Sequence, residues 1–190
     1  MSVRVLTTTV DDLDARTAYA VWRLRQDVFV VEQDCPYPDL DGRDLEPATR
    51  HVVLFEDDAV LGTLRVLDDG GRARIGRVVL ARAARGRGLA ALLMDEAMGL
   101  CGDREVRLDA QTPLAGFYAD YGFEVAGPEF DEDGIMHVPM RRGARQERVP
   151  VVMMGACPST SSSRRSGTSS PPTSRSTPSL PSSSSPSRPG

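Results

Sequence analysis

Residues 82–97, RAARGRGLAALLMDEA, follow an apolar run and place arginine and glycine where a strand must give way to a helix. The first amides of a helix lack intrahelical partners and the helix dipole is positive there, so an anion is stabilised at that end. Gly86 and Gly88 would let a phosphate approach the main chain, and Arg85 and Arg87 carry guanidinium groups that suit phosphate geometry. The junction therefore predicts an anion site, while a tight turn with solvated arginines is the alternative that the turn alone leaves open.

The segments around this junction indicate an α/β (α+β) domain. Alternating apolar residues predict strands, and apolar residues three and four apart predict helices. Asp11 or Asp12 is expected to cap the first helix and Thr112 the last one, and the proline-rich residues 35–49 are expected to form a long irregular loop. The expected order is β-α-β-β-β-α-β-α-β-β, with strands at 3–8, 51–56, 59–68, 73–81, 105–111, 123–127 and 135–141 and helices at 13–32, 88–101 and 112–122.

Composition divides the chain into two parts. Serine occurs once in residues 1–146, whereas fifteen serines lie between Ser159 and Ser187. We therefore predict a folded domain over 1–146 and a disordered, low-complexity Ser/Pro/Arg-rich tail over 147–190. The first part has 18 basic and 26 acidic residues, a net charge of −8. An acidic domain is a poor nucleic-acid binder and a plausible host for a cationic substrate, although ordinary solubility explains the charge equally well.

The cysteines and histidines argue against disulfide and metal chemistry. Cys35, Cys101 and Cys157 are widely spaced and odd in number, and with only two histidines they give no zinc spacing. We expect no metal. The N-terminus does not resemble a signal peptide and no apolar run approaches membrane-spanning length, so the sequence predicts a cytoplasmic protein without a membrane partner. It defines no oligomeric state.

Two motifs relate this domain to a known superfamily. Arg85-x-x-Gly88-x-Ala90, opening a helix after an apolar strand, resembles the pyrophosphate-binding loop of the GCN5-related N-acetyltransferases (GNAT), and FYADYGF at 117–123 is similar to their F-Y-x-x-x-G-F helix end. The glycine motif at 85–90 matches neither a P-loop nor a G-x-G-x-x-G dinucleotide-binding loop. Residues 24–51, 109–123 and 131–140 further resemble the ElaA group, and the likeness covers roughly residues 10–142.

The resemblance implies a GNAT fold and acetyl-CoA as co-substrate. In this fold a mixed, mostly antiparallel central sheet is flanked by helices and splays apart at the cofactor site. The pantetheine arm would lie along the main chain of Val78, Val79 and Leu80, and an N–H near Leu80 would polarise the thioester carbonyl. The pyrophosphate would lie on the amides of Gly86, Arg87, Gly88, Leu89, Ala90 and Ala91, beside the Arg85 and Arg87 side chains.

Candidates for the acid and base come from the same resemblance. Tyr118 matches the residue that protonates the departing thiolate, with packing beside Phe117 as its alternative role. Glu32, Asp41, His51 and His137, or ordered water, are candidates for the base that deprotonates the acceptor amine. Glu32 is our first choice, because VVEQ belongs to the group signature, and a solvated helix end is its alternative. Asp41, His51 and His137 are also expected to contact the acceptor, although a packed or surface position explains either histidine.

These expectations converge on an N-acetyltransferase that moves an acetyl group from acetyl-CoA directly to a primary amine of a small-molecule or peptide acceptor. The loop acids Asp39, Asp41 and Asp44 suggest that this acceptor is cationic. The alternative function is a non-catalytic module that binds acyl-CoA and regulates a partner. Release of CoA in the presence of amines distinguishes the two.

Overall fold

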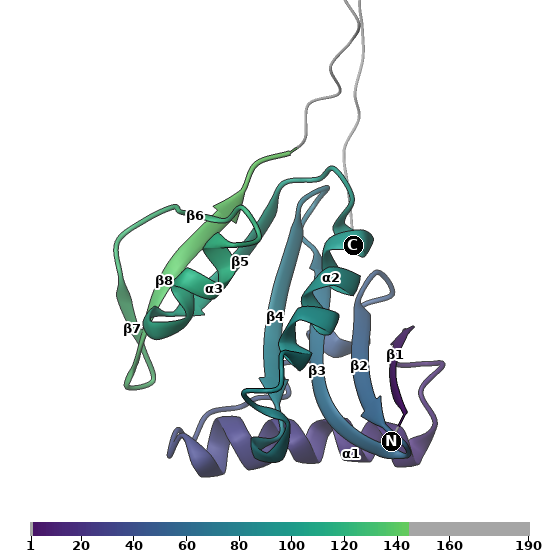
Figure 1. Cartoon of the computed structure of the whole chain (residues 1–190). Helices are drawn as coiled ribbons and strands as arrows, with labels where there is room; N and C mark the ends of the chain where they lie inside the picture. Colours follow the sequence, from purple (N-terminus) through teal and green to yellow (C-terminus); the bar gives the residue numbers. More distant parts are fainter. Residues whose placement is uncertain (1, 145–190) are drawn as a thin grey trace, which may run out of the picture. The chain divides into compact units, whose positions relative to one another are not determined.

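The computed structural model describes residues 2–144, so the predicted tail lies outside the described residues (Figure 1). Its centre is one sheet in the order β1-β2-β3-β4-β5-β8-β6, with β7 paired to β8. Every pair is antiparallel except β4–β5, so the mixed, mostly antiparallel sheet is confirmed. The strands are β1 (Val3–Thr8), β2 (Arg50–Glu56), β3 (Ala59–Asp68), β4 (Ala73–Leu80), β5 (Val106–Gln111), β6 (Glu124–Val125), β7 (Phe130–Glu132) and β8 (Ile135–Arg142).

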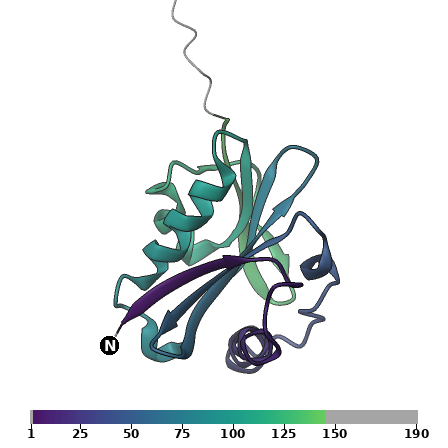
Figure 2. The ribbon, with the colours of Figure 1, turned by 90° about the vertical axis from the view of Figure 1, so that its right-hand side faces the viewer.

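Helices cover both faces of this sheet. Helix α1 (Ala15–Arg25) continues directly into a π-helix, η1 (Gln26–Glu32), and α2 (Leu89–Cys101) and α3 (Ala115–Ala119) follow later in the chain. Three short 3-10 turns are η2 (Arg43–Leu45), η3 (Arg82–Ala84) and η4 (Thr112–Leu114). Figure 2 shows α1 end-on and α2 on the opposite side of the strands. The sheet is therefore sandwiched between these two helices over its first four strands.

The sequence of β2 explains why it lies between two helices. Its apolar residues alternate in direction: Val53 and Phe55 pack with Val21 of α1. Val52 and Leu54 belong to the larger core that contains α2. A strand buried on both faces reads as a continuous apolar run. Each fully buried Val or Leu contributes roughly 1.5–3 kcal/mol.

Several local predictions were wrong. Asp14, not Asp11 or Asp12, caps α1, because its side chain accepts hydrogen bonds from the amides of Arg16 and Thr17. The expected helix over 112–122 is divided into η4 and α3, and the Thr112 hydroxyl is buried without a hydrogen-bond partner instead of capping a helix. Strand β7 was not expected and lies between the strands that were predicted over 123–127 and 135–141.

The sheet opens between its two parallel strands. β4 and β5 pair only through Ala73↔Val106 and Arg74↔Arg107, and beyond these residues the strands separate (Figure 1). A β-bulge lies in the diverging part of β4, where the pairing with β3 changes register and Arg77 has a positive φ of 54°. The predicted splaying of the sheet is confirmed, and the bulge bends the strand that borders the opening.

Within residues 2–144, no helix combines the length and apolar character that crossing a bilayer requires. Cys35 and Cys101 are both buried free thiols, and Cys157 lies outside the described residues. The same part of the chain contains no group of three or more His, Cys, Asp or Glu side chains arranged to hold a metal ion. The cytoplasmic location stays a prediction.

Candidate functional site

The main chain of β4 presents polar groups to the opening in the sheet. The amide of Ala81 donates to the carbonyl of Leu61 in β3 at 2.7 Å, so this residue faces β3. Successive residues of a strand direct their N–H and C=O groups to opposite sides, so Leu80 faces away from β3. Arg85 supports this, because its Nε donates to the Leu80 carbonyl at 3.2 Å. Val79 pairs with Thr63, so its own main chain faces β3.

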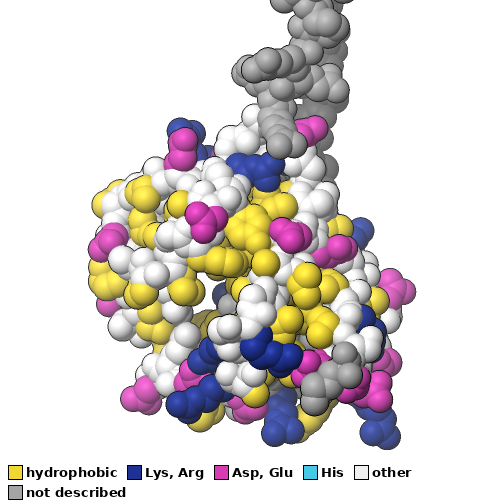
Figure 3. Space-filling view, in the orientation of Figure 1, with side chains coloured by type: hydrophobic (Ala, Val, Ile, Leu, Met, Phe, Trp, Pro, Cys, Tyr) yellow, Lys and Arg dark blue, Asp and Glu magenta, His cyan; other side chains and the backbone are white. Residues whose placement is uncertain are grey.

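The turn after β4 leaves its main chain accessible. Gly86 and Gly88 have positive φ angles of 72° and 74°, and Gly88 is the N-cap of α2 without any side-chain cap. No atom lies within 4 Å of the place where a Cβ would stand on either glycine. The turn therefore leaves room for a ligand beside the uncapped start of α2, at the positive end of its dipole, as an anion site requires. Figure 3 shows a hollow between the two parts of the sheet, with arginine side chains gathered beside it.

Both arginines of this turn form ion pairs with glutamates. Arg85 binds the two carboxylate oxygens of Glu32 at 2.5 and 3.1 Å, and Arg87 binds those of Glu56 at 2.5 and 3.3 Å. The hydrogen bond from Arg85 holds the pKa of Glu32 below its usual range. A carboxylate that is stabilised in this way is a poorer proton acceptor, so the geometry weighs against Glu32 as the base.

Tyr118 combines a packed ring with a hydroxyl that is free to act. The ring lies edge-on to Phe117 and Phe123, and only 6% of the residue is exposed. Burial raises the pKa of Tyr118 to about 12, and no hydrogen bond or charge within residues 2–144 contributes to this shift. The phenol therefore stays protonated at neutral pH, in the state that a proton donor needs.

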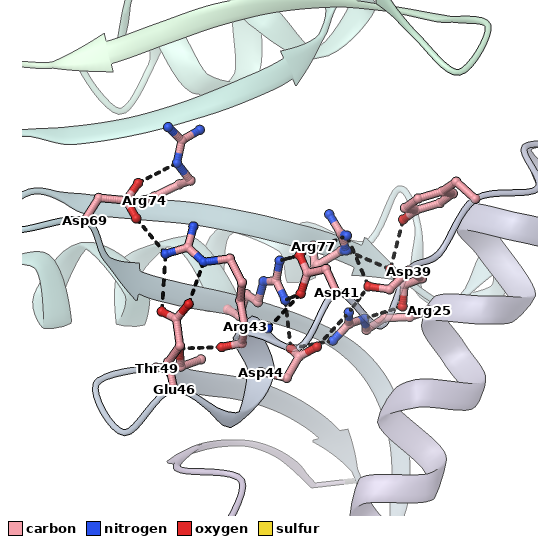
Figure 4. Close-up of polar contacts among 12 residues, drawn as sticks. Arg25, Asp39, Asp41, Arg43, Asp44, Glu46, Thr49, Asp69, Arg74 and Arg77 are labelled. Atoms are coloured by element: carbon pink, nitrogen blue, oxygen red, sulfur yellow. Dashed lines mark hydrogen bonds and ion pairs between the residues drawn. The ribbon is translucent and has the colours of Figure 1, made fainter. Parts of the chain in front are cut away.

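The three acids of the irregular loop are all paired with arginines. Arg25 binds Asp39 and Asp44, and Asp41 forms a two-point contact with Arg65, whose hydrogen bonds hold the pKa of Asp41 well below its usual range. Figure 4 shows the loop acids turned inward toward these arginines. They therefore supply no free negative charge, and the argument from these residues for a cationic acceptor is wrong.

His51 lies in the same interior. It is 1% exposed, its Nε2 is 3.3 Å from the Asp44 carbonyl, and burial lowers its pKa. An amine in solution cannot reach a fully buried imidazole without local opening of the fold. Asp41, also expected at the acceptor, is partly exposed but is held by Arg65. Both residues have structural contacts that account for their positions.

His137 is placed differently. It lies on β8 opposite Gln111, the last residue of β5, and its ring stacks on Phe130. Its Nδ1 is 2.9 Å from the Ile135 carbonyl. A carbonyl only accepts, so Nδ1 donates this hydrogen bond, and in the neutral imidazole the lone pair is then on Nε2. Of the four base candidates, His137 has a half-buried ring beside the end of β5 and is not held in a two-point ion pair.

Two further contacts, missed from the sequence, join the end of η1 to this region. The Gln111 amide donates to the Gln33 side chain at 3.2 Å, and the Cys35 thiol contacts the Asp133 carbonyl at 3.4 Å. Gln33 and Gln111 belong to the VVEQ and DAQTP segments of the group signature, which was the only signal available for them. Together these contacts join the segment after η1 to the end of β5 and to the β7–β8 turn.

A separate surface cavity of about 510 Å³ lies against β5, β6 and β8. Its charged lining includes Arg74 and Asp109, which already pair with each other at 3.0 Å. None of the glycine-turn residues and neither Tyr118 nor His137 lines it. This cavity is therefore separate from the residues that the sequence predicted to carry chemistry.

A sheet that opens between two parallel strands, beside a glycine turn that starts a helix, defines the acyl-CoA-binding transferase fold. The family model for the acetyltransferase (GNAT) domain matches residues 27–143, and the chain belongs to this family. It is 50% identical over 136 residues to a UPF0039 protein of Mycobacterium tuberculosis, covering 69% of this chain and 87% of that protein. It is also 38% identical over 138 residues to Protein ElaA of Escherichia coli, with 69% and 90% covered.

Solved structures agree with this assignment. An acyl-CoA N-acyltransferase from Pseudomonas aeruginosa has a TM-score of 0.70 and 40% identity, covering 75% of this chain and all of that one. The ElaA structure from Escherichia coli also has a TM-score of 0.70, with 34% identity and 74% and 99% coverage. The resemblance predicted from the motifs is therefore confirmed at the level of the family and of the ElaA group.

Proposed function

We propose that this protein is an N-acetyltransferase that moves the acetyl group of acetyl-CoA directly to a primary amine. One observation carries the proposal. The main chain of Leu80 faces away from β3 and α2 starts without a side-chain cap, which supplies the groups that a thioester and a pyrophosphate require; we assign the third group, the acid for the leaving thiolate, to the protonated Tyr118 hydroxyl. The open space over Gly86 and Gly88 fits the pyrophosphate.

The steps of the transfer follow from these groups. The amine nitrogen attacks the thioester carbonyl, and the N–H of Leu80 stabilises the negative charge on the carbonyl oxygen. A donor of this kind contributes roughly a hundredfold to a thousandfold in rate. The C–S bond then breaks, the electron pair leaves with sulfur, and the Tyr118 hydroxyl gives its proton to the thiolate. The amide product and CoA result.

The base is the second part of the proposal. We assign the removal of the amine proton to Nε2 of His137, in place of Glu32. The Nδ1 contact of His137 with the Ile135 carbonyl directs the lone pair of the neutral ring to Nε2 at the end of β5, whereas Glu32 is bound on both oxygens by Arg85. A positioned general base contributes typically a hundredfold or more in rate. Replacing His137 by glutamine is therefore expected to lower turnover and to leave the binding of CoA unchanged.

A cationic acceptor remains the proposed class, on different residues from those first expected. The β7–β8 turn carries Asp131, Glu132 and Asp133, and their negative charges, with that of Asp34, raise the pKa of the neighbouring Cys35 thiol after the effect of burial. Unlike the loop acids, these carboxylates are exposed. They lie beside the Gln33–Gln111 contact, where a protonated amine would approach.

The test is the release of CoA thiol from acetyl-CoA in the presence of a panel of polyamines, amino sugars and peptides. Wild-type protein is expected to release CoA with at least one amine, and His137→Gln and Tyr118→Phe are expected to be slow with the same amine. Stabilisation by CoA without release for any acceptor would indicate the non-catalytic acyl-CoA-binding module instead. No stabilisation by CoA would refute both.

A further inference from the structure

The bulge in β4 has a backbone conformation that needs an explanation. Arg77 has φ of 54°, a left-handed value that residues with a side chain rarely adopt, at the point where Thr63↔Val79 and Arg65↔Gly76 differ in register. Glycine would adopt it without strain. Strained positions persist where the surrounding structure holds them, so the contacts of the Arg77 side chain are informative.

The Arg77 side chain is anchored on the irregular loop. Its Nε lies 2.7 Å from an Asp39 carboxylate oxygen in an ion pair that is not aligned as a hydrogen bond. One Nη donates to the Asp39 carbonyl at 3.1 Å and lies 3.5 Å from the Asp41 carboxylate. The guanidinium also lies 5.3 Å from the centre of the Tyr37 ring. The loop therefore holds the side chain from several directions.

These anchors are themselves fixed, because the ion pairs form a closed ring. Going round it, each arginine binds two aspartates and each aspartate binds two arginines (Figure 4). We call it the arginine–aspartate ring; its members are Arg25, Asp39, Arg77, Asp41, Arg65 and Asp44. It carries no net charge, and four of its six residues are at most 8% exposed. It links α1, the loop, β3 and β4.

Three residues beyond Arg77 lies Leu80, whose main chain faces the opening. After the bulge, the regular pairing with β3 resumes at Val79 and Leu80. The extra residue of the bulge shifts the alternation of β4 by one residue, so the bulge determines whether the Leu80 N–H points toward β3 or toward the opening. We propose that the arginine–aspartate ring holds Arg77 in its left-handed conformation and so directs the Leu80 N–H at the thioester carbonyl. Arg77 is then a positioning residue for acyl transfer, and this inference rests on the proposed function.

The experiment measures the carbonyl stretch of bound acetyl-CoA by infrared difference spectroscopy, using a ¹³C-labelled acetyl group. A hydrogen bond from Leu80 lowers this frequency in the wild-type complex. Arg77→Gly tolerates the backbone angle but cuts the ring, and is expected to lose at least half of the frequency shift and about tenfold in kcat, with the affinity for CoA changed by less than about threefold. Arg77→Lys keeps the positive charge but loses the planar guanidinium that can bind two acceptors at once, and it is expected to recover part of the frequency shift and part of kcat.

Arg74→Ala is the matched control, because Arg74 is also a β4 arginine in ion pairs but lies outside the bulge and the ring. It is expected to show the wild-type shift. A wild-type shift and kcat in Arg77→Gly would overturn the inference. If Arg77→Gly does not fold, Asp41→Asn decides: a reduced shift supports the inference and a wild-type shift with wild-type kcat overturns it. Failure of the wild-type protein to bind acetyl-CoA would instead defeat the proposed function.

Discussion

Glu32 and Arg85 form a two-point ion pair that joins the last residue of η1 to the glycine turn before α2, across 53 residues of sequence. The same guanidinium is the one proposed to lie beside the CoA pyrophosphate. The Glu32 carboxylate and a CoA phosphate compete for the same Arg85 guanidinium, so binding of the cofactor has to loosen the Glu32–Arg85 ion pair. Exposed pairs of this kind exchange readily.

Glu32→Gln is expected to bind CoA about twofold to fivefold more tightly than wild type, because the anion no longer competes with a carboxylate, and the gain should shrink at high salt. Isothermal titration calorimetry at two salt concentrations measures this. Glu56→Gln, which frees Arg87 in the same way, is the matched variant. A loss of turnover near a hundredfold in Glu32→Gln would restore Glu32 as the base.

Gly88→Glu is expected to abolish the thermal stabilisation of the protein by CoA. The glutamate would place negative charge against the pyrophosphate at a residue whose φ of 74° already disfavours a side chain. A ligand at a hundred times its Kd stabilises by about 2.7 kcal/mol, which is easily seen in a melting curve. Gly99→Glu, near the far end of α2, should keep the stabilisation. Full stabilisation in Gly88→Glu would place the site elsewhere.

Tyr118→Phe is expected to lower kcat roughly tenfold to a hundredfold with little change in the KM for acetyl-CoA, because the lost hydroxyl acts on the leaving group. With its pKa raised to about 12, this hydroxyl stays protonated, so it adds no loss of activity up to about pH 10. Tyr121→Phe is the control, since Tyr121 also packs on Phe117. Equal turnover in wild type and Tyr118→Phe would leave Tyr118 as a packing residue.

Arg25→Met is expected to lower the free energy of unfolding by about 3–5 kcal/mol, because removing one partner leaves buried aspartates short of a counter-charge. Arg25 is 1% exposed and binds both Asp39 and Asp44. Urea unfolding measures the difference. Arg23→Met removes an exposed pair with Asp27 from the same helix and should change stability by less than about 1 kcal/mol. Similar values for the two variants would contradict a structural role for the ring.

The protein is expected to lose stability as the pH falls from about 7 to 5, through His51. Burial holds its pKa in the folded state below the unfolded value near 6.5, so below that pH the unfolded chain binds more protons, its free energy falls relative to the folded state, and the free energy of unfolding decreases. His51→Gln should flatten this part of the profile. A second loss should begin below about pH 4, where the lowered pKa values of Asp41 and Asp44 stop favouring the fold. Denaturant titrations across pH 3–8 measure both.

Most of the fold follows from local patterns. Strand β3 has the predicted bounds, 59–68, because alternating apolar residues between turn-forming acids define both of its ends. The start of α2 follows from Gly88 and the leucines after it. Both signals lie within a few residues of the element that they predict.

The ring could not be predicted in this way. Arg77 lies 36 residues from Asp41 and 38 from Asp39, and nothing local indicates which arginine meets which acid in an arginine-rich chain. The loop acids were therefore interpreted as substrate ligands. The π-helix η1 was predicted as part of one α-helix for a related reason. Its apolar residues have the same spacing as in an α-helix, and no local pattern indicates hydrogen bonds between residues five apart.

The narrow junction between β4 and β5 has a mechanical consequence. Among the described residues, two pairs, Ala73↔Val106 and Arg74↔Arg107, make the whole ladder between these strands. Rotation about this junction would widen or narrow the opening without breaking a ladder inside either half of the sheet. Under the proposed function, a junction two residues long would then act as the hinge of the donor site, and stiffening it would restrict the length of the acyl chain without changing any side chain that contacts the donor.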